Sequence, residues 1–176
     1  MESFHRYWNT NVLEELFDTA PKNVKWDWNS GYQAWEAKLS VCDNLYGLMM
    51  SSFPWEMGGW KVQEFDDKTW SMLRHGSWCF EFYEQREDGS QHHDVTGTAY
   101  KCAPRVFGSI GLALVELVKD NPRIFKNICF GGKEANRLSL YSKIAPKLAR
   151  VLNKKLFYND KGDHFFLVDQ SIPVKS

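Results

Sequence analysis

A short glycine-containing segment carries the residue types best suited to bind a phosphate group. Its members are Arg105, Val106, Phe107, Gly108, Ser109 and, after one isoleucine, Gly111. Pro104 precedes them and is typical of the first turn of a helix, so we expect a helix to begin here. The first N–H groups of a helix lack intrahelical partners and carry the positive end of its dipole, so they attract phosphate. Glycine lets the backbone approach a ligand closely, although it would equally permit close packing of the helix against a sheet.

The histidines and cysteines do not show the spacing of a metal site. His92 and His93 would point to opposite faces of a strand, so they cannot easily share one ion. The four cysteines, Cys42, Cys79, Cys102 and Cys129, are scattered and form no C-x-x-C pair, which argues against structural zinc. We therefore expect no metal, and we expect buried thiols rather than two disulfides. Cys102 precedes the predicted helix, where a thiol could act as a nucleophile, but no histidine has a recognisable relation to it.

The hydrophobic pattern predicts the elements that position these residues. Helices are expected over 4–18, over 31–49, from Pro104 to Asp120, and from about Ala135 through a kink at Pro146. Strands are expected over 60–65, 77–83, 93–100, 124–130, 155–158 and 164–169. The strand at 93–101 should pair with 77–84, and the strand at 124–130 should lie parallel to 93–101. A strand, helix, strand run normally makes a right-handed crossover, so the pattern predicts an α/β (α+β) fold with a mixed central sheet flanked by helices.

Length and composition indicate one globular domain over 1–176, with a helical N-terminal region at 1–55 and a sheet-and-helix core at 56–176. The chain is 43% hydrophobic and 25% charged. It has no apolar run of membrane-spanning length and no signal-peptide pattern at its start, which predicts a cytoplasmic protein. Residues 1–100 hold 8 Lys and Arg against 16 Asp and Glu, whereas residues 101–176 hold 14 against 6. Either the two halves attract each other, or the basic half receives phosphate groups.

The segment from Thr96 to Phe157 resembles the core of the GNAT superfamily of acetyltransferases. In that family a central strand leads into a helix whose N-terminus binds the pyrophosphate of acetyl-coenzyme A. The family pattern is Arg or Gln, two residues, Gly, one residue, then Gly or Ala. Arg105 and Gly108 match it, whereas Ile110 occupies the last position and a glycine follows one residue late. The resemblance covers roughly the last 80 residues and does not extend to 1–55.

The resemblance implies an acyl-CoA-dependent N-acyltransferase, either active or a non-catalytic descendant, with acetyl-CoA as cofactor. Residues 105–111 would bind the cofactor, with Lys143 near its phosphates. Tyr141 lies in a Leu-Tyr context like that of the family's tyrosine, which protonates the departing thiolate; the Gly-Phe that follows in the family is missing. Glu81, with Glu84 and Asp94 as alternatives, would be the general base. An acceptor amine would enter over residues 45–70, and membranes and nucleic acids are not expected partners.

A second class of function starts from the tryptophans. All eight lie between Trp8 and Trp78, in the acidic half of the chain. Most would pack in the core, but some could be exposed anchors, since tryptophan is enriched at binding hot spots. The alternative is therefore a non-enzymatic binding, inhibitor or virion protein that acts through an acidic, Trp-rich surface on a host or viral protein. Small proteins of tailed phages are a setting in which degraded GNAT-like domains are expected, and this would place the protein in a host cytoplasm.

Overall fold

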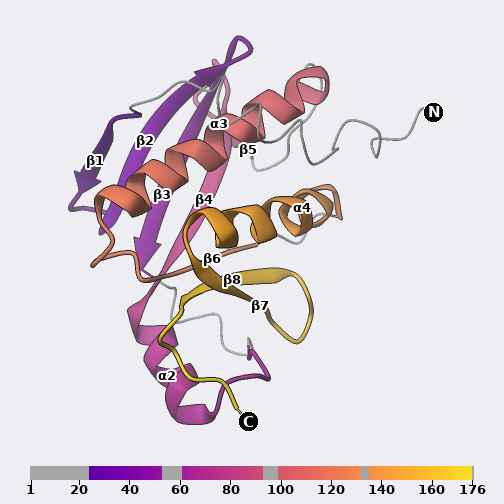
Figure 1. The fold of residues 1–176 in the computed structure, drawn as a ribbon. Coiled ribbons are helices and arrows are strands. Elements are labelled where there is room, and N and C mark those ends of the chain that lie inside the picture. The colour runs from indigo at the N-terminus through magenta and orange to yellow at the C-terminus, as the bar shows by residue number, and fades with distance from the viewer. Residues whose placement is uncertain (1–23, 53–60, 93–98, 132–134, 176) are drawn as a thin grey trace.

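A computed structural model describes residues 24–52, 61–92, 99–131 and 135–175, and shows an α+β fold built on one mixed sheet (Figure 1). The strands follow the order β1-β2-β3-β4-β6-β8-β7, with short β5 paired to β4. Their bounds are β1 Trp26–Asn29, β2 Ala34–Val41, β3 Asn44–Ser52, β4 Ser77–Gln85, β5 Gln91–His92, β6 Asn127–Gly131, β7 Lys154–Tyr158 and β8 His164–Asp169. The helices are α2 Asp67–Gly76, α3 Ala99–Asp120 and α4 Ala135–Val151. The predicted fold class, a mixed central sheet flanked by helices, is confirmed.

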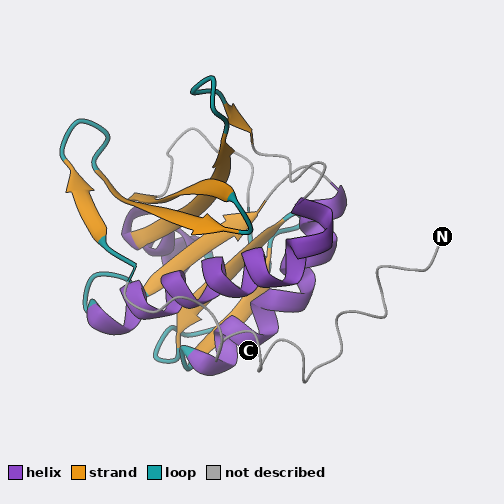
Figure 2. Cartoon of the chain, turned by 90° about the horizontal axis from the view of Figure 1, so that it is seen from above, coloured by secondary structure: helices purple, strands orange, loops and turns teal. Residues whose placement is uncertain are grey.

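The helices cover the two faces of the sheet unequally (Figure 2). Residues of α3 and α4 pack with Leu48, Phe82 and Phe130 in the larger hydrophobic core. Residues of α2 pack with Cys79, Cys129 and Phe166 in a smaller core. Because successive strand residues point to opposite faces, these two cores mark the two sides of the sheet. We call them the α3–α4 face and the α2 face.

The predicted helix over 31–49 is wrong, because this segment forms the hairpin of β2 and β3. Ala37, Leu39 and Val41 are buried in alternation, as expected for a strand with one face on the core. The hairpin turns at Cys42 and Asp43, which both have a positive φ, of 52° and 63°. A turn of this handedness usually contains glycine, so the sequence carried no recognisable turn signal. The described part of the expected helical N-terminal region is therefore strand, and the expected helix over 4–18 lies outside the described residues.

The predicted strand over 60–65 is also wrong. Residues 61–66 form a turn that buries Val62 and Phe65 and leads into α2, which the sequence analysis did not anticipate. Asp66 is the N-cap of α2, and its carboxylate accepts a hydrogen bond of 2.7 Å from the backbone N–H of Thr69. This bond satisfies one of the N–H groups left unpaired at a helix start. The carboxylate thus serves the fold, and the cap lowers the pKa of Asp66.

The crossover between parallel strands is present, but its first strand is β4 and not the segment 93–101. The strands β4 and β6 pair in parallel from Ser77 with Asn127 to Cys79 with Cys129. The chain passes between them through α3, on one face of the sheet (Figure 1). Of the expected strand at 93–100, residues 93–98 lie outside the described residues, and Ala99 and Tyr100 belong to α3 instead. The short strand β5, Gln91–His92, comes before this segment and pairs with Glu84 and Gln85. The strands β4, β6, β7 and β8, the helix end at Asp120 and the helix α4 are confirmed.

Candidate functional site

The strands β4 and β6 separate soon after they begin to pair, and this separation defines the candidate site. Their ladder ends at Cys79 and Cys129, although β4 continues to Gln85 and β6 to Gly131. β3 occupies one edge of β4 along its whole length, and on the other edge β5 pairs only with Glu84 and Gln85. Among the described residues, the β6-facing edge of residues 80–83 therefore has no strand partner. We call this opening the β4–β6 gap.

On the α3–α4 face the gap is lined by aromatic rings. Tyr141 of α4 is buried, with 5% of its surface exposed. Its ring packs edge-on against those of Phe82, Phe130 and Phe165, at distances between ring centres of 6.2, 5.3 and 6.1 Å. A cavity of about 20 Å³, the size of one water molecule, lies among these rings and α3. Tyr141 thus lies on α4 beside the gap, on the α3–α4 face. It is the tyrosine that the resemblance implies as the acid.

On the α2 face, Glu81 of β4 borders the gap, and His164 of β8 lies on the other side of β6. Glu81 follows Cys79 by two residues and shares its face, since Phe80 and Phe82 point to the other side. Gly131 pairs with His164 of β8. A Cβ at Gly131 would clash with the His164 ring and with the backbone oxygen of Asp163, so only glycine lets the imidazole lie against β6. Glu81 and His164 therefore flank β6 from its two neighbouring strands, on the order of 10 Å apart or more.

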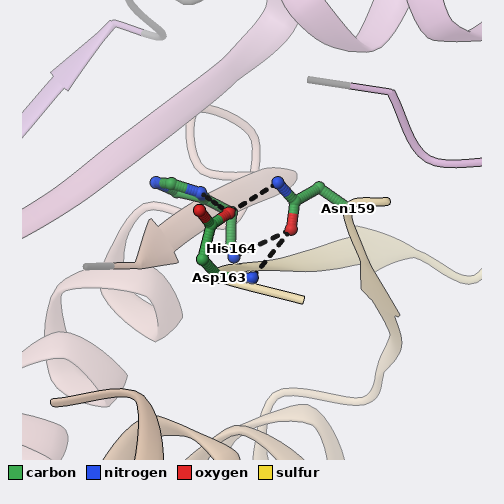
Figure 3. Close-up of polar contacts among 3 residues, drawn as sticks. All are labelled: Asn159, Asp163 and His164. Atoms are coloured by element: carbon green, nitrogen blue, oxygen red, sulfur yellow. Dashed lines mark hydrogen bonds and ion pairs between the residues drawn. The ribbon is translucent and has the colours of Figure 1, made fainter. Parts of the chain in front are cut away.

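A carboxylate and an amide hold His164 in place (Figure 3). Asp163 Oδ1 lies 2.6 Å from Nδ1 of His164 and accepts a hydrogen bond of 2.7 Å from Nδ2 of Asn159. The Asn159 side-chain oxygen accepts from the backbone N–H groups of Asp163 and His164, both at 3.0 Å. Burial opposes ionisation of Asp163, but the hydrogen bonds from Asn159 and His164 outweigh it and lower the pKa of Asp163. A carboxylate on one ring nitrogen fixes the orientation of the imidazole.

Asn159, Asp163 and His164 were not predicted as site residues from the sequence. Their signal was the adjacent pair Asp163 and His164 after the turn that begins at Asn159. Which strand those residues face is set by the register of β8 against β6, and a single sequence does not show this register.

The predicted acid and base fall on opposite faces of the sheet. Tyr141 belongs to the α3–α4 face and Glu81 to the α2 face. The alternative base Glu84 shares the α3–α4 face, and its buried Oε2 has no hydrogen-bond partner among the described residues. Asp94, the other alternative, lies outside the described residues.

The predicted start of α3 is wrong, and this changes the phosphate-binding argument. The helix begins at Ala99, so residues 105–111 lie in its second and third turns, where N–H groups bond within the helix. Val106, Phe107, Gly108, Ser109 and Gly111 are buried, whereas Arg105 is exposed and Lys143 on α4 is half-buried. The physical argument for unpaired N–H groups applies instead to the first turn, Ala99 to Cys102. The role of residues 105–111 and Lys143 in cofactor binding stays a prediction.

The cysteines depart in part from the expectation of buried thiols. Cys42 and Cys102 form a disulfide that joins the β2–β3 turn to the first turn of α3. Cys79 and Cys129 are free and buried, with their Sγ atoms 2.6 Å apart at the base of the gap. Burial and the neighbouring Cys79 raise the pKa of the Cys129 thiol well above its usual value. A thiol in this state is a poor nucleophile.

The Trp-rich surface of the alternative function is only partly present. Among the described tryptophans Trp28 is exposed, at 45%, whereas Trp70 is buried and Trp26, Trp35 and Trp78 are half-buried. In the described ranges no group of His, Cys, Asp and Glu is arranged to hold a metal ion. Nor does that part of the chain contain a helix long and apolar enough to cross a membrane.

Comparisons of the chain with protein-family models, with curated proteins and with solved structures find no match. The function proposed below is therefore inferred from the geometry of the β4–β6 gap.

Proposed function

We propose that this chain is a GNAT-like acyltransferase that transfers an acyl group from a coenzyme A thioester to an amine in the β4–β6 gap. The observation that carries the proposal is the gap itself. Two parallel strands joined through α3 pair over three residue positions and then separate. Tyr141 packs beside the opening on one face, Glu81 borders it on the other, and His164 lies across β6 on that second face.

The gap suits the amide-containing arm of coenzyme A. An open strand edge offers N–H and C=O groups to an extended ligand with amides, and residues 80–83 of β4 present such an edge. The Cys42–Cys102 disulfide fixes the start of α3 near the β2–β3 turn. Leu45, near the start of β3, pairs with Gln85 at the end of β4. The first turn of α3 thus lies at the same end of the sheet as this edge. Its unpaired N–H groups, with Arg105 on the next turn, would hold the phosphates.

The acceptor amine would approach from the α2 face. Glu81 would take the proton that the amine loses as it attacks, and His164, held by Asp163, would orient the acceptor. The bound thioester supplies the activated carbonyl. Tyr141, from the other face, would donate a proton to the departing sulfur, the role that the resemblance implies. The two proton transfers then take place on opposite sides of the sheet.

Calorimetric titration with acetyl-CoA tests the donor site. We expect a dissociation constant in the micromolar range, or roughly 8 kcal/mol. Arg105→Glu should weaken binding about tenfold or more by reversing a charge near the phosphates. Arg123→Glu is the matched control, because Arg123 is equally exposed but lies beyond the other end of α3. If wild type binds no acetyl-CoA, the proposal fails, and the non-enzymatic binding protein becomes the better account.

A further inference from the structure

Cys79 and Cys129 occupy the last paired position of the parallel ladder between β4 and β6. Both side chains belong to the smaller core, so they leave neighbouring strands on the same side of the sheet. Their Sγ atoms lie 2.6 Å apart, and both residues are free cysteines. The proposed acyl transfer uses neither thiol, so this close pair has no role in the function described so far.

The backbone places the two residues within the range that a disulfide bond requires. Neighbouring strands lie about 4.8 Å apart, and the Cα atoms of bonded cysteines are commonly about 4.4–6.8 Å apart. The two sulfurs would have to approach each other by roughly 0.5 Å to reach the S–S bond length of about 2.05 Å. Each strand is also held on its other edge, β4 by β3 and β6 by β8. The sheet therefore keeps the two thiols within reach of a bond before any bond forms.

The surroundings of the pair favour a bond between the two sulfurs. Cys129 is 0% exposed and Cys79 is 4% exposed, in a core that includes Trp70 and Phe166. Burial is the main cause that raises the pKa of the Cys129 thiol, so a thiolate is disfavoured here. A disulfide is uncharged and has no S–H group to satisfy, so it suits an apolar core. Within the described ranges no third His, Cys, Asp or Glu completes a set of metal ligands with the pair.

We propose that Cys79 and Cys129 form a reversible disulfide bond, which joins β4 to β6 at the base of the β4–β6 gap. The oxidant is a low-molecular-weight disulfide of the class of oxidised glutathione. The Cys79 thiolate attacks one sulfur of this molecule and releases the first glutathione thiolate. The Cys129 thiolate then attacks the Cys79 sulfur of the mixed disulfide and releases the second. Two protein thiols are oxidised, one glutathione disulfide is reduced to two thiols, and these take up the two protons.

Burial sets the rate of this exchange, whereas the sheet sets its equilibrium. A buried thiol with a raised pKa reacts slowly, so the pair should stay reduced until an oxidant is supplied. Cys79 reacts first, because Cys129 is fully buried. The inference does not depend on the proposed acyl transfer.

The variant Cys42→Ser, Cys102→Ser isolates the pair, because the chain has four cysteines. The variant is equilibrated with reduced and oxidised glutathione at graded concentrations, once in urea below its unfolding transition and once in denaturing guanidinium chloride. Urea at this level speeds local opening, and each series starts from reduced and from oxidised protein, so agreement between the two shows equilibrium. Alkylation followed by mass spectrometry counts the free thiols and detects adducts with glutathione.

The quantity compared is the value of [GSH]²/[GSSG] at which half of the protein is oxidised. We expect this value to be at least about a hundredfold higher for the folded than for the denatured protein. The sheet holds the two sulfurs together in the folded protein, whereas a sequence separation of 50 residues divides them in the unfolded chain. Cys129→Ala in the same background is the control, and it should form only a mixed disulfide of Cys79 with glutathione and no internal bond.

The inference is overturned if the folded variant keeps both thiols under conditions that oxidise the denatured chain. It is also overturned if the two half-oxidation values agree within about threefold. Should the serine variant not fold, a digest of oxidised wild type decides: a linked pair of peptides containing Cys79 and Cys129 supports the bond, and its absence overturns it. Calorimetry with acetyl-CoA separates the two proposals, because failure to bind would overturn the proposed function and leave the disulfide unaffected.

Discussion

The carboxylate of Asp163 lies 2.6 Å from Nδ1 of His164, and the amide of Asn159 holds that carboxylate from the other side. The hydrogen bonds outweigh burial and lower the pKa of Asp163. A depressed pKa in the folded state means that the ionised carboxylate contributes stability. This contribution is fully present above the unfolded-state pKa near 4 and is lost as the pH falls through the lower folded-state value.

We therefore expect the unfolding free energy of wild type to fall below about pH 4 more steeply than that of Asp163→Asn. Denaturant unfolding at a series of pH values measures this difference. Asp160→Asn provides the control, because Asp160 is an exposed carboxylate on the same turn. Parallel stability curves for wild type and Asp163→Asn would show that the ionised form of Asp163 does not stabilise the fold.

Glu81 and Glu84 lie on opposite faces of β4 and make a matched pair for the general base. If Glu81 takes the proton of the amine, Glu81→Gln should lower kcat by about a hundredfold or more at neutral pH. Glu84→Gln should change it by less than about fivefold, because Glu84 faces away from the acceptor side. Release of coenzyme A from acetyl-CoA, with spermidine as a primary-amine probe, measures both. A larger loss in Glu84→Gln would place the base on the α3–α4 face.

Substitution of Glu84 also tests how burial of its carboxylate affects the stability of the fold. Glu84 is paired with Tyr46, and burial together with this carboxylate raises the pKa of Tyr46 to about 12. Because the buried Oε2 of Glu84 has no hydrogen-bond partner in the part of the chain that the structure describes, replacing the charge with an amide should not lower the unfolding free energy. Chemical denaturation of Glu84→Gln checks this. A loss of more than about 1 kcal/mol would indicate a stabilising partner for the charge.

The Tyr141 hydroxyl should matter for turnover and little for folding. Tyr141→Phe keeps the ring contacts with Phe82, Phe130 and Phe165, so the unfolding free energy should change by about 1 kcal/mol or less. If the hydroxyl donates a proton to the leaving sulfur, kcat should fall about tenfold to a hundredfold, with little change in the KM for acetyl-CoA. Unchanged kcat with reduced stability would make Tyr141 a core residue only.

The Cys42–Cys102 disulfide should stabilise the fold, because it closes a long loop, with a sequence separation of 60. Its reduction should lower the unfolding free energy by roughly 2–4 kcal/mol. Thermal or denaturant unfolding with and without dithiothreitol measures the effect. The double variant Cys42→Ser, Cys102→Ser should be insensitive to the reductant, and equal sensitivity in both proteins would assign the effect to other cysteines.

The sequence predicts the second half of the fold better than the first. The strands β6, β7 and β8 are short apolar runs bounded by glycine or by turn residues, so their pattern is unambiguous. Over 31–49, by contrast, Trp35, Leu39, Cys42 and Leu45 are spaced for one helical stripe, while Ala37, Leu39 and Val41 alternate as in a strand. The hairpin that decides between these patterns turns at Cys42 and Asp43, without glycine. The local hydrophobic pattern fits both a helix and a hairpin, and the pairing of β3 with β4 in the sheet selects the hairpin.

The candidate site, like the fold, could be predicted from the sequence only in part. The sequence identified Tyr141 and Glu81 as residues capable of proton transfer. Their placement on opposite faces follows from the packing of α4 on one face of the sheet and from the alternation of side chains along β4. The predicted helix start at Pro104 was wrong, because Pro104 lies inside α3. The group of Asp163 and His164 needed the pairing of Gly131 with His164, a contact between residues 33 positions apart. Such contacts are fixed by the sheet and are not visible in local spacing.

The most direct measurement of the central claim is hydrogen–deuterium exchange across β4, with and without acetyl-CoA. The account predicts that peptides covering residues 80–83 exchange at least tenfold more slowly when acetyl-CoA is bound, because its amides pair with the open strand edge. Peptides covering β1, an edge strand on the far side of the sheet, should not change. Binding of acetyl-CoA without protection at residues 80–83, or with equal protection at β1, would contradict the claim that the β4–β6 gap holds the acyl donor.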